Sequence, residues 1–247
     1  MLELVAHRGY ARCFPENTLA ALEGAVAAGA RYVEVDVQLT ADAVPVLFHD
    51  RDCRRLCGLP GAIDDYDWAQ AATFTLSWPE GCGGAHTPIP LARVTDLARF
   101  LAAHPAVTAF VEIKHEAVRR LGARPVVQAV HGLLAPVLAQ TVLISFSRPA
   151  LAVARELWPT IGLVTRRYRE FCARSTAALA PEYHFCDIKG LPRHGRLGHP
   201  GTTLVVYEVD EAREARALEA RGVRFIETFA VAELAAALRM PVRERPL

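Results

Sequence analysis

A chain of 247 residues with 52% hydrophobic and 22% charged residues can bury a large core, and it matches the usual size of a single α/β barrel domain. The formal net charge of +1, without a long run of one sign, excludes the electrostatic footprint expected for binding nucleic acid or an anionic membrane. We expect one domain over residues 1–247. No apolar run reaches the roughly 18 residues of a membrane-spanning helix and no secretory signal follows Met1, so the expected location is the cytoplasm.

Strand and helix patterns alternate along the chain. The candidate strands are short apolar or alternating segments, at residues 2–6, 31–39, 44–48, 110–114, 142–145, 161–164, 183–186, 203–207 and 224–227. The first candidate helix begins near Asn17 or Thr18, either of which can cap it, and ends at Gly29. The others lie at residues 91–103, 125–138, 149–157, 170–180, 211–221 and 231–238. This alternation predicts parallel strands covered by helices, most simply a (β/α)8 TIM barrel.

There are nine candidate strands, one more than the eight that a (β/α)8 barrel contains. The gap between Leu39 and Pro45 is too short for a helical crossover, so residues 44–48 are predicted to fold back on the preceding strand as a hairpin outside the eight. Residues 51–88 are irregular and rich in glycine and proline. The expected fold is therefore α/β, a (β/α)8 TIM barrel with a small insertion after the second barrel strand.

The strand at residues 31–39 alternates between an apolar face and a polar face that carries Glu34 and Asp36. Taken alone, this pattern also fits an exposed antiparallel strand with its polar side in water. The strand that ends at Lys114 repeats the pattern, with Glu112 on the polar face. Two such strands would bring three carboxylates and an ammonium group to one place.

Polar side chains stand late in several of the predicted strands. The set comprises His7, Arg8, Glu34, Asp36, Glu112 and Lys114. Active sites of TIM barrels lie at the C-terminal rim of the strands. Each residue has a structural explanation of its own, but no such explanation covers all six, and their coincidence at one rim points to an active site.

Three carboxylates crowded into a barrel mouth repel one another and raise their own pKa values unless a cation neutralises them. An all-oxygen ligand set without thiolates favours a hard ion, Mg²⁺ or Ca²⁺, over zinc. Such an ion polarises a phosphoryl oxygen and eases deprotonation of a bound hydroxyl. His7 and His49 titrate near neutral pH and are candidates for general base and general acid on opposite sides of a phosphorus atom. The other seven histidines are predicted to be structural.

Five short motifs follow one another within about the first 115 residues. They are His7-Arg8-Gly9, Pro15-Glu16-Asn17-Thr18, Glu34-Val35-Asp36-Val37, Pro45-Val46-Leu47-Phe48-His49-Asp50 and Glu112-Ile113-Lys114. Their order and spacing resemble those of the glycerophosphodiester phosphodiesterase family. The resemblance implies a TIM barrel with a small insertion after His49 and the hydrolysis of a glycerophosphodiester to sn-glycerol 3-phosphate and an alcohol.

The resemblance also implies a role for each matching residue. The implied ligands of one divalent cation are Glu34, Asp36 and Glu112, the implied acid–base pair is His7 and His49, and the implied contacts of the phosphate and its neighbourhood are Arg8 and Lys114. In the mechanism that the family implies, the free glycerol hydroxyl attacks phosphorus first, and water then opens the cyclic intermediate.

The C-terminal half departs from the family pattern. Tyr207-Glu208-Val209-Asp210 stands where the family has a Trp-Thr-Val-Asn run, and Tyr207 is predicted to pack against the carbon skeleton of the substrate. Glu227-Thr228-Phe229 stands where the last strand of the family ends in Ile-Thr-Asp, and Glu227 either enters the site or pairs with an arginine. These departures leave the hydrolytic residues intact and leave the preferred alcohol open.

Two other functions stay open. One is a lipid-acting, phospholipase D-like enzyme of the same barrel, resembling the sphingomyelinase D group, and the lack of an apolar membrane-docking helix counts against it. The other is a non-catalytic barrel that binds phosphate compounds or a protein, and the presence of both histidines and all three acids counts against that. We expect a small-molecule substrate, no nucleic acid and no stable membrane anchor, and we leave homo-oligomer formation open.

The six cysteines are scattered without a disulfide framework, in a chain that is large enough not to need one. We therefore predict free thiols throughout. Cys53 and Cys57 have the spacing of half a zinc site, but no second pair follows, so zinc is not expected.

Overall fold

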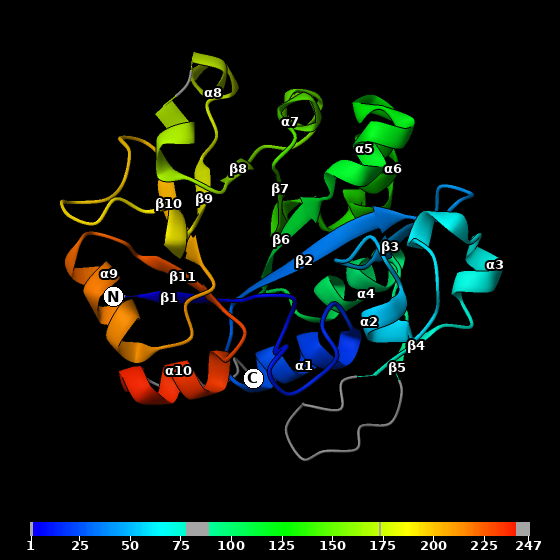
Figure 1. The fold of residues 1–247 in the computed structure, drawn as a ribbon, viewed down its shortest axis with the longest axis horizontal. Coiled ribbons are helices and arrows are strands. Elements are labelled where there is room, and N and C mark those ends of the chain that lie inside the picture. The colour runs from blue at the N-terminus through cyan, green and yellow to red at the C-terminus, as the bar shows by residue number, and fades with distance from the viewer. Residues whose placement is uncertain (1, 78–88, 173, 241–247) are drawn as a thin grey trace.

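The computed structural model describes residues 2–77, 89–172 and 174–240, which form a closed barrel of eight parallel strands surrounded by helices (Figure 1). In order around the barrel, the strands are β1 (Glu3–Ala6), β2 (Tyr32–Leu39), β6 (Thr108–Ile113), β7 (Thr141–Ser145), β8 (Ile161–Thr165), β9 (Tyr183–Asp187), β10 (Thr203–Tyr207) and β11 (Phe225–Thr228). Pairing of β11 with β1 and of β1 with β2 closes the ring. The predicted (β/α)8 barrel is confirmed, whereas the predictions for Cys82 and His86 lie outside the described residues.

The barrel helices lie where the periodicity predicts them, with three changes. They are α1 (Leu19–Ala27), α4 (Val94–Ala103), α5 (His115–Leu121), α6 (Ala123–Leu134), α7 (Arg148–Ala154), α8 (Arg174–Leu179), α9 (Ala212–Ala220) and α10 (Val231–Leu238). The helix α5 directly after Lys114 was not predicted. The predicted helix 170–180 begins in a 3-10 helix, η3 (Tyr168–Cys172), and only its later part is α-helical. The predicted helix 125–138 changes to a 3-10 helix at Ala135–Gln140, because Pro136 lacks the backbone N–H that the α-helix needs.

No single helix among the described residues is long and apolar enough to cross a membrane. Taken together, the helix α5 and the segment Ala123–Gln140 have the length and the apolar composition of a membrane span, but they are bent by 118° relative to each other.

The extra strand β3 (Pro45–Leu47) pairs antiparallel with β2, with Leu47 opposite Val37, so the predicted hairpin is confirmed. The chain then leaves the barrel through a set of short elements, which are α2 (Arg54–Cys57), η1 (Ile63–Asp65), α3 (Trp68–Ala71), β4 (Thr75–Leu76) and β5 (Ile89–Pro90). They share a small core of their own, built around Phe48, Leu56 and Ile63. This insertion therefore packs as a unit beside the mouth of the barrel.

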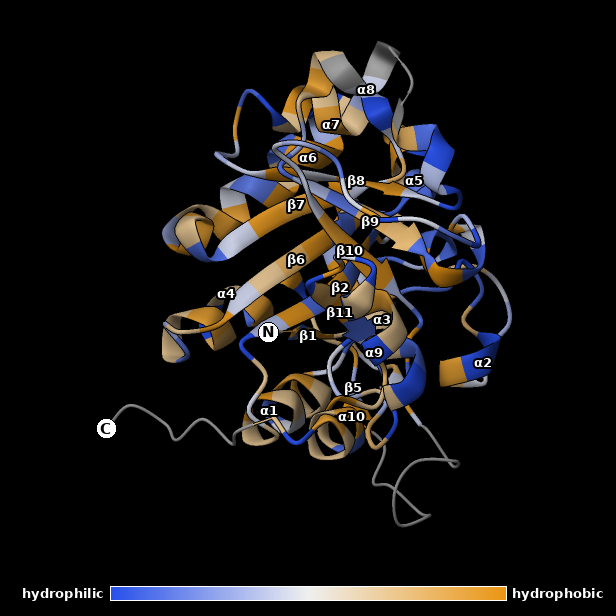
Figure 2. Ribbon diagram, turned by 90° about the vertical axis from the view of Figure 1, so that its left-hand side faces the viewer, coloured by the Kyte–Doolittle hydropathy of each residue, from blue (hydrophilic) through white to orange (hydrophobic). Residues whose placement is uncertain are grey.

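The alternation of β2 sorts its side chains between two cores. Val33 and Val35 lie in the main core between strands and helices, and Tyr32 packs with Phe110 inside the barrel. Figure 2 shows β6 and β7 largely in the hydrophobic colour, as expected for strands buried on both faces. The polar face of β2 is not in bulk water, because Glu34 is only 2% exposed. The alternative of an exposed antiparallel strand is therefore wrong.

The prediction of free thiols holds for Cys53, Cys57 and Cys186. It is wrong for Cys13, which forms a disulfide, and its partner is not among the side chains that the structure describes. A disulfide depends on two Cα atoms lying about 4.4–6.8 Å apart, and this distance is set by the fold and not by spacing along the chain.

Candidate active site

The C-terminal ends of the strands surround a cavity of about 250 Å³. It is lined by every side chain that the sequence placed at the site, namely His7, Arg8, Glu34, Asp36, His49, Glu112, Lys114 and Tyr207. These residues come from β2, β6 and β10 and from the segments that follow β1, β3 and β6. The structure thus brings together residues that lie up to 200 positions apart in the chain.

Three carboxyl groups form the centre of this cavity. Asp36 on β2 is level with Glu112 on β6, and Glu34 lies one inward-facing position earlier on β2. Glu34, Asp36 and Glu112 each offer an oxygen atom, these atoms lie within 4.8 Å of one another, and all three side chains are buried. Such a group can hold a divalent metal ion.

Two cationic side chains contact the same carboxylates. The Nζ atom of Lys114 lies 3.2 Å from Oδ1 of Asp36 and 3.0 Å from Oε1 of Glu112. The Nε atom of Arg8 lies 3.1 Å from Oδ2 of Asp36, and the backbone N–H of Arg8 donates to Oε2 of Glu34 over 3.1 Å. Arg8 and Lys114 therefore border the group of three carboxylates on both sides of Asp36.

A glycine and an asparagine shape the loop after β1 that carries Arg8, and the Asn17 backbone N–H donates to the Arg8 carbonyl oxygen over 3.0 Å. Gly9 has a φ of +77°, and a Cβ atom there would lie 2.6 Å from the backbone carbon of Ala21. Asn17 is fully buried and makes two hydrogen bonds with Asp36: its Nδ2 donates to Oδ2 over 3.0 Å, and its Oδ1 accepts from the Asp36 backbone N–H over 2.9 Å. Of the two predicted helix caps, Thr18 is the one that accepts the capping hydrogen bond, from the N–H of Ala21.

The pKa of Asp36 is shifted in the opposite direction from the pKa values of the neighbouring carboxyl groups Glu34 and Glu112. Burial works against the charged form of Asp36, but Lys114 and Arg8 outweigh it and hold the pKa of this carboxyl well below its ordinary range. Burial raises the pKa of Glu34 well above its ordinary value, and the nearby carboxylates raise it further. Burial also raises the pKa of Glu112, although Lys114 opposes it.

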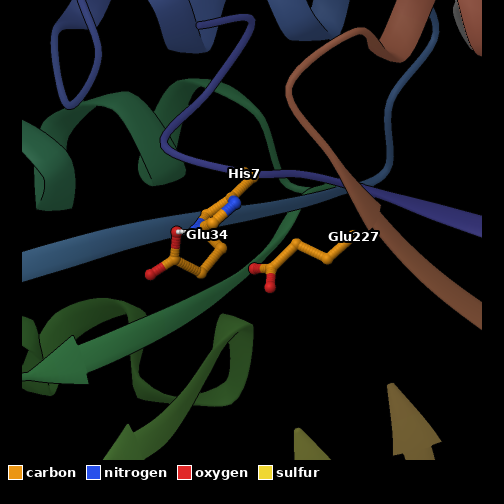
Figure 3. Close-up of side chains that lie close together, drawn as sticks. All are labelled: His7, Glu34 and Glu227. Carbon is orange, nitrogen blue, oxygen red and sulfur yellow. Dashed lines mark ion pairs between the residues drawn. The ribbon is translucent and has the colours of Figure 1, made fainter. Parts of the chain in front are cut away.

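A fourth buried carboxyl group, Glu227 on β11, also faces the cavity (Figure 3). It is 2% exposed, and its Oε1 atom has no hydrogen-bond partner among the described residues. Burial raises the pKa of Glu227 well above its ordinary value, with Glu112 and Asp36 adding to the effect. Of the two predicted alternatives, Glu227 enters the site, and it forms no ion pair with an arginine in the part of the chain that the structure describes.

His7 lies on one side of the carboxylates. Its ring stacks on Phe229 at a centroid distance of 4.3 Å, and its Nε2 lies 3.8 Å from Oε2 of Glu34. Burial, reinforced by Arg8, lowers the pKa of His7 well below its ordinary value. Burial therefore favours the neutral form of the ring, which has a nitrogen lone pair that can accept a proton.

His49 lies on the other side, directly after the hairpin strand β3. Its Nδ1 lies 2.8 Å from Oδ1 of Asp50, and Oδ2 of Asp50 accepts a hydrogen bond from Nε of Arg55 over 2.6 Å. Arg55 in turn donates two hydrogen bonds to Glu16, over 3.0 and 2.7 Å, and Glu16 accepts a further one from Arg8 over 2.9 Å. A continuous chain of ion pairs thus connects the two histidine sides of the site.

Three residues of this chain of ion pairs have no predicted role, namely Glu16, Asp50 and Arg55. Glu16 and Asp50 stand inside the motifs quoted above, which was a usable signal, but Arg55 lies in the irregular insertion and carried none. Tyr207 was assigned to the substrate, and the structure shows that it lines the cavity while its hydroxyl donates to the carbonyl oxygen of Thr165 over 3.1 Å.

A second, wider cavity of about 900 Å³ opens beside the first, toward the insertion. The two cavities share five lining residues, which are His49, Glu112, Lys114, Phe146 and Arg166. The site therefore has a narrow end inside the barrel, a wide end against the insertion, and His49 and Lys114 where the two ends meet.

The sequence model of the glycerophosphoryl diester phosphodiesterase family matches residues 7–228. The chain belongs to this family. A Mycobacterium tuberculosis protein named "Probable glycerophosphodiester phosphodiesterase 1" is 31% identical to this phosphodiesterase over 245 residues, covering 91% of this chain and 88% of that protein. Family membership makes the chain an enzyme of the phosphoric diester hydrolase class.

Solved structures agree with the fold. An Oleispira antarctica phosphodiesterase, solved in complex with its product sn-glycerol-3-phosphate, superposes with a TM-score of 0.81 at 20% identity and with coverage of 96% of both chains. A glycerophosphodiester phosphodiesterase from Parabacteroides distasonis gives a TM-score of 0.74 at 24% identity, with coverage of 96% of this chain and 97% of that one. At these identities the likeness concerns the fold of the phosphodiesterase.

Proposed function

We propose that this phosphodiesterase hydrolyses glycerophosphodiesters to sn-glycerol 3-phosphate and an alcohol with the help of one divalent cation, Mg²⁺ or Ca²⁺. The observation that carries the proposal is the group of three buried carboxylates, Glu34, Asp36 and Glu112, in a cavity that two histidines also line. Family membership supports the reaction, and the product complex of the Oleispira antarctica relative supports glycerol 3-phosphate as the retained half.

The residues present fit a divalent cation. Four buried carboxyl groups, Glu227 among them, line the cavity, and Arg8 and Lys114 pair with two of them, Asp36 and Glu112, so a cation would offset the repulsion that remains among the acids. The oxygen-only set Glu34, Asp36 and Glu112 suits Mg²⁺ or Ca²⁺. When bound, the cation polarises a phosphoryl oxygen and offsets the negative charge that develops on it. Arg8 and Lys114 hold the remaining phosphate oxygens.

His7 is the general base in this proposal. It lines the narrow end of the site, and its Nε2 lies 3.8 Å from Oε2 of Glu34, whose carboxylate would stabilise the ring once it has taken a proton. The proton comes from the glycerol hydroxyl that attacks phosphorus. Tyr207 packs against the carbon skeleton on the same side.

His49 is the general acid. It lies where the two cavities meet, on the side of the wide end, which takes the variable alcohol. The Asp50 carboxylate accepts the hydrogen bond from Nδ1 and so stabilises a positively charged ring, leaving the Nε2 proton for the departing alcohol oxygen. Water then opens the cyclic phosphate as the two histidines exchange roles.

The reaction is tested by incubating the protein with glycerophosphocholine or glycerophosphoethanolamine and Mg²⁺ or Ca²⁺. The expected products are glycerol 3-phosphate and the free alcohol, and EDTA should stop their release. Release of choline phosphate would contradict the proposal, because it requires cleavage of the other ester bond. Turnover of intact sphingomyelin or lysophosphatidylcholine would favour the lipid-acting alternative, and binding without turnover the non-catalytic one. The cytoplasmic location stays a prediction.

A further inference from the structure

Glu227 has no function in the reaction described above, although it is built into the site. Its side chain is only 2% exposed, and Oε1 has no hydrogen-bond partner among the described residues. Leaving a buried carboxyl oxygen without a hydrogen bond destabilises a protein, so its retention calls for a ligand that supplies the donor. Figure 3 shows the carboxyl group directed toward Glu34 and the His7 ring, that is, into the cavity.

The position of Glu227 identifies the half of the substrate that reaches it. Glu227 lines the narrow cavity and not the wide one, and its ligand atom lies within 4.8 Å of those of His7 and Glu34. In the sheet, Glu227 on β11 is paired with Val5 on β1. Phe225, the preceding residue of β11 that faces the barrel interior, packs in the core below the cavity. If Lys114 binds the phosphate at the junction of the cavities, the glycerol half of the substrate therefore lies in the narrow cavity, next to His7 and Glu227.

The chemistry of glycerol supplies the missing donor. Once the phosphate is on one terminal carbon, two hydroxyls remain, on the middle carbon and on the far terminal carbon. The middle hydroxyl is the one whose attack closes a five-membered cyclic phosphate, so His7 takes its proton. The far hydroxyl has no role in bond making and no other assigned partner.

We propose that Glu227 binds the far terminal hydroxyl of the glycerol moiety, so that the enzyme selects phosphodiesters whose alcohol carries this third oxygen. The inference rests on the proposed function of the site. Glu227 is a specificity residue and not a proton carrier. A carboxyl oxygen accepts a hydrogen bond from a hydroxyl whether or not the carboxyl group is ionised, so the inference does not depend on its titration.

The test compares two substrates that differ by one hydroxyl. Glycerophosphocholine is compared with the analogue in which propane-1,2-diol replaces glycerol, with the phosphate on carbon 1. This analogue keeps the attacking hydroxyl and lacks only the far one. Wild-type kcat/KM is expected to be about 10- to 100-fold lower for the analogue, because the buried carboxyl group is then left unpaired.

Three variants assign this selectivity to Glu227. Glu227→Leu removes the acceptor, so the two substrates should differ by less than about threefold, and its rate on the analogue should equal or exceed that of the wild type. Glu227→Gln keeps an acceptor oxygen and should retain most of the selectivity. The control is Glu156→Gln, which lies outside the lining of both cavities, whose carboxylate pairs with Arg124 over 2.9 Å and which should leave the selectivity unchanged.

The outcomes separate this inference from the function on which it rests. If the wild type turns over both substrates equally well, or if Glu227→Leu keeps the wild-type selectivity, the inference is overturned while the proposed function stands. If the wild type turns over neither substrate, both are overturned. The wild-type comparison requires no variant, so equal turnover of the two substrates would overturn the inference even if a substitution impairs folding.

Discussion

Asp50 offers the most direct test of the acid assigned to the wide end of the site. Asp50→Asn keeps the shape of the side chain and removes the charge that stabilises protonated His49 across the 2.8 Å contact. A hydrogen bond to a charged partner contributes about 1.5–3 kcal/mol. The two side chains are 31% and 24% exposed, so the lower part of this range, about 1.5–2 kcal/mol, applies. At 1.36 kcal/mol per tenfold change in rate, we expect kcat to fall about 10- to 30-fold.

The leaving group decides whether this loss reflects acid catalysis. Choline needs a proton as it departs, whereas p-nitrophenol leaves as a stable anion. The kcat of Asp50→Asn should therefore fall about 10- to 30-fold with glycerophosphocholine and less than about threefold with the p-nitrophenyl ester of glycerol phosphate, measured at saturating substrate and metal. An equal loss with both esters would refute His49 as the general acid.

A matched control removes a similar charge elsewhere on the insertion. Asp64 is 28% exposed and lies 3.6 Å from Arg120, and Asp64→Asn should leave kcat with both esters within about twofold of the wild type. Arg55 keeps its two hydrogen bonds to Glu16 in Asp50→Asn, so the insertion should stay in place. Unchanged circular dichroism spectra and melting temperatures would verify this.

Three further predictions concern catalysis, stability and pH. His49→Ala should lower kcat by about 10²–10⁴, and an unchanged rate would remove His49 from the mechanism. Asn17→Ala removes both hydrogen bonds to Asp36 and puts alanine at a φ of 59°, so urea unfolding should show a loss of about 2–4 kcal/mol, and a loss below 1 kcal/mol would contradict this account. Burial lowers the pKa of His184 to about 3. Because the unfolded chain binds this proton near pH 6.5, the free energy of unfolding should fall by up to about 1.4 kcal/mol per unit as the pH drops from 6.5 toward 3, and His184→Gln should reduce that slope.

The order of the elements and the fold class followed from the sequence because both depend on local patterns. The alternation of β2 fixed which side chains face inward, and the short gap before Pro45 excluded a helical crossover. The helix α5 was missed because it begins at His115, immediately after a strand residue that was already assigned to the site. A helix of seven residues is too short to show a clear periodicity.

The site residues could be predicted where they stand at the ends of strands. The features that could not be predicted depend on distances across the barrel. Nothing near Glu227 in the sequence indicates that its Oε1 atom lacks a hydrogen-bond partner among the described residues, because that depends on which side chains from other strands reach it. The link from Arg55 to Glu16 likewise joins two loops that are 39 residues apart and only meet once the insertion has packed.

The proposed base and acid are carried by different parts of the fold, and this bears on how the enzyme handles different alcohols. His7 follows a barrel strand, next to the three carboxylates, whereas His49 follows a hairpin strand and begins the insertion that lines the wide cavity. Under the proposed function, changes in the insertion can reshape the end that takes the alcohol without moving Glu34, Asp36 or Glu112. The ion pairs from Asp50 through Arg55 and Glu16 to Arg8 connect the insertion to the loop after β1, so the proposed proton donor, His49, would keep its place when the surface around it changes.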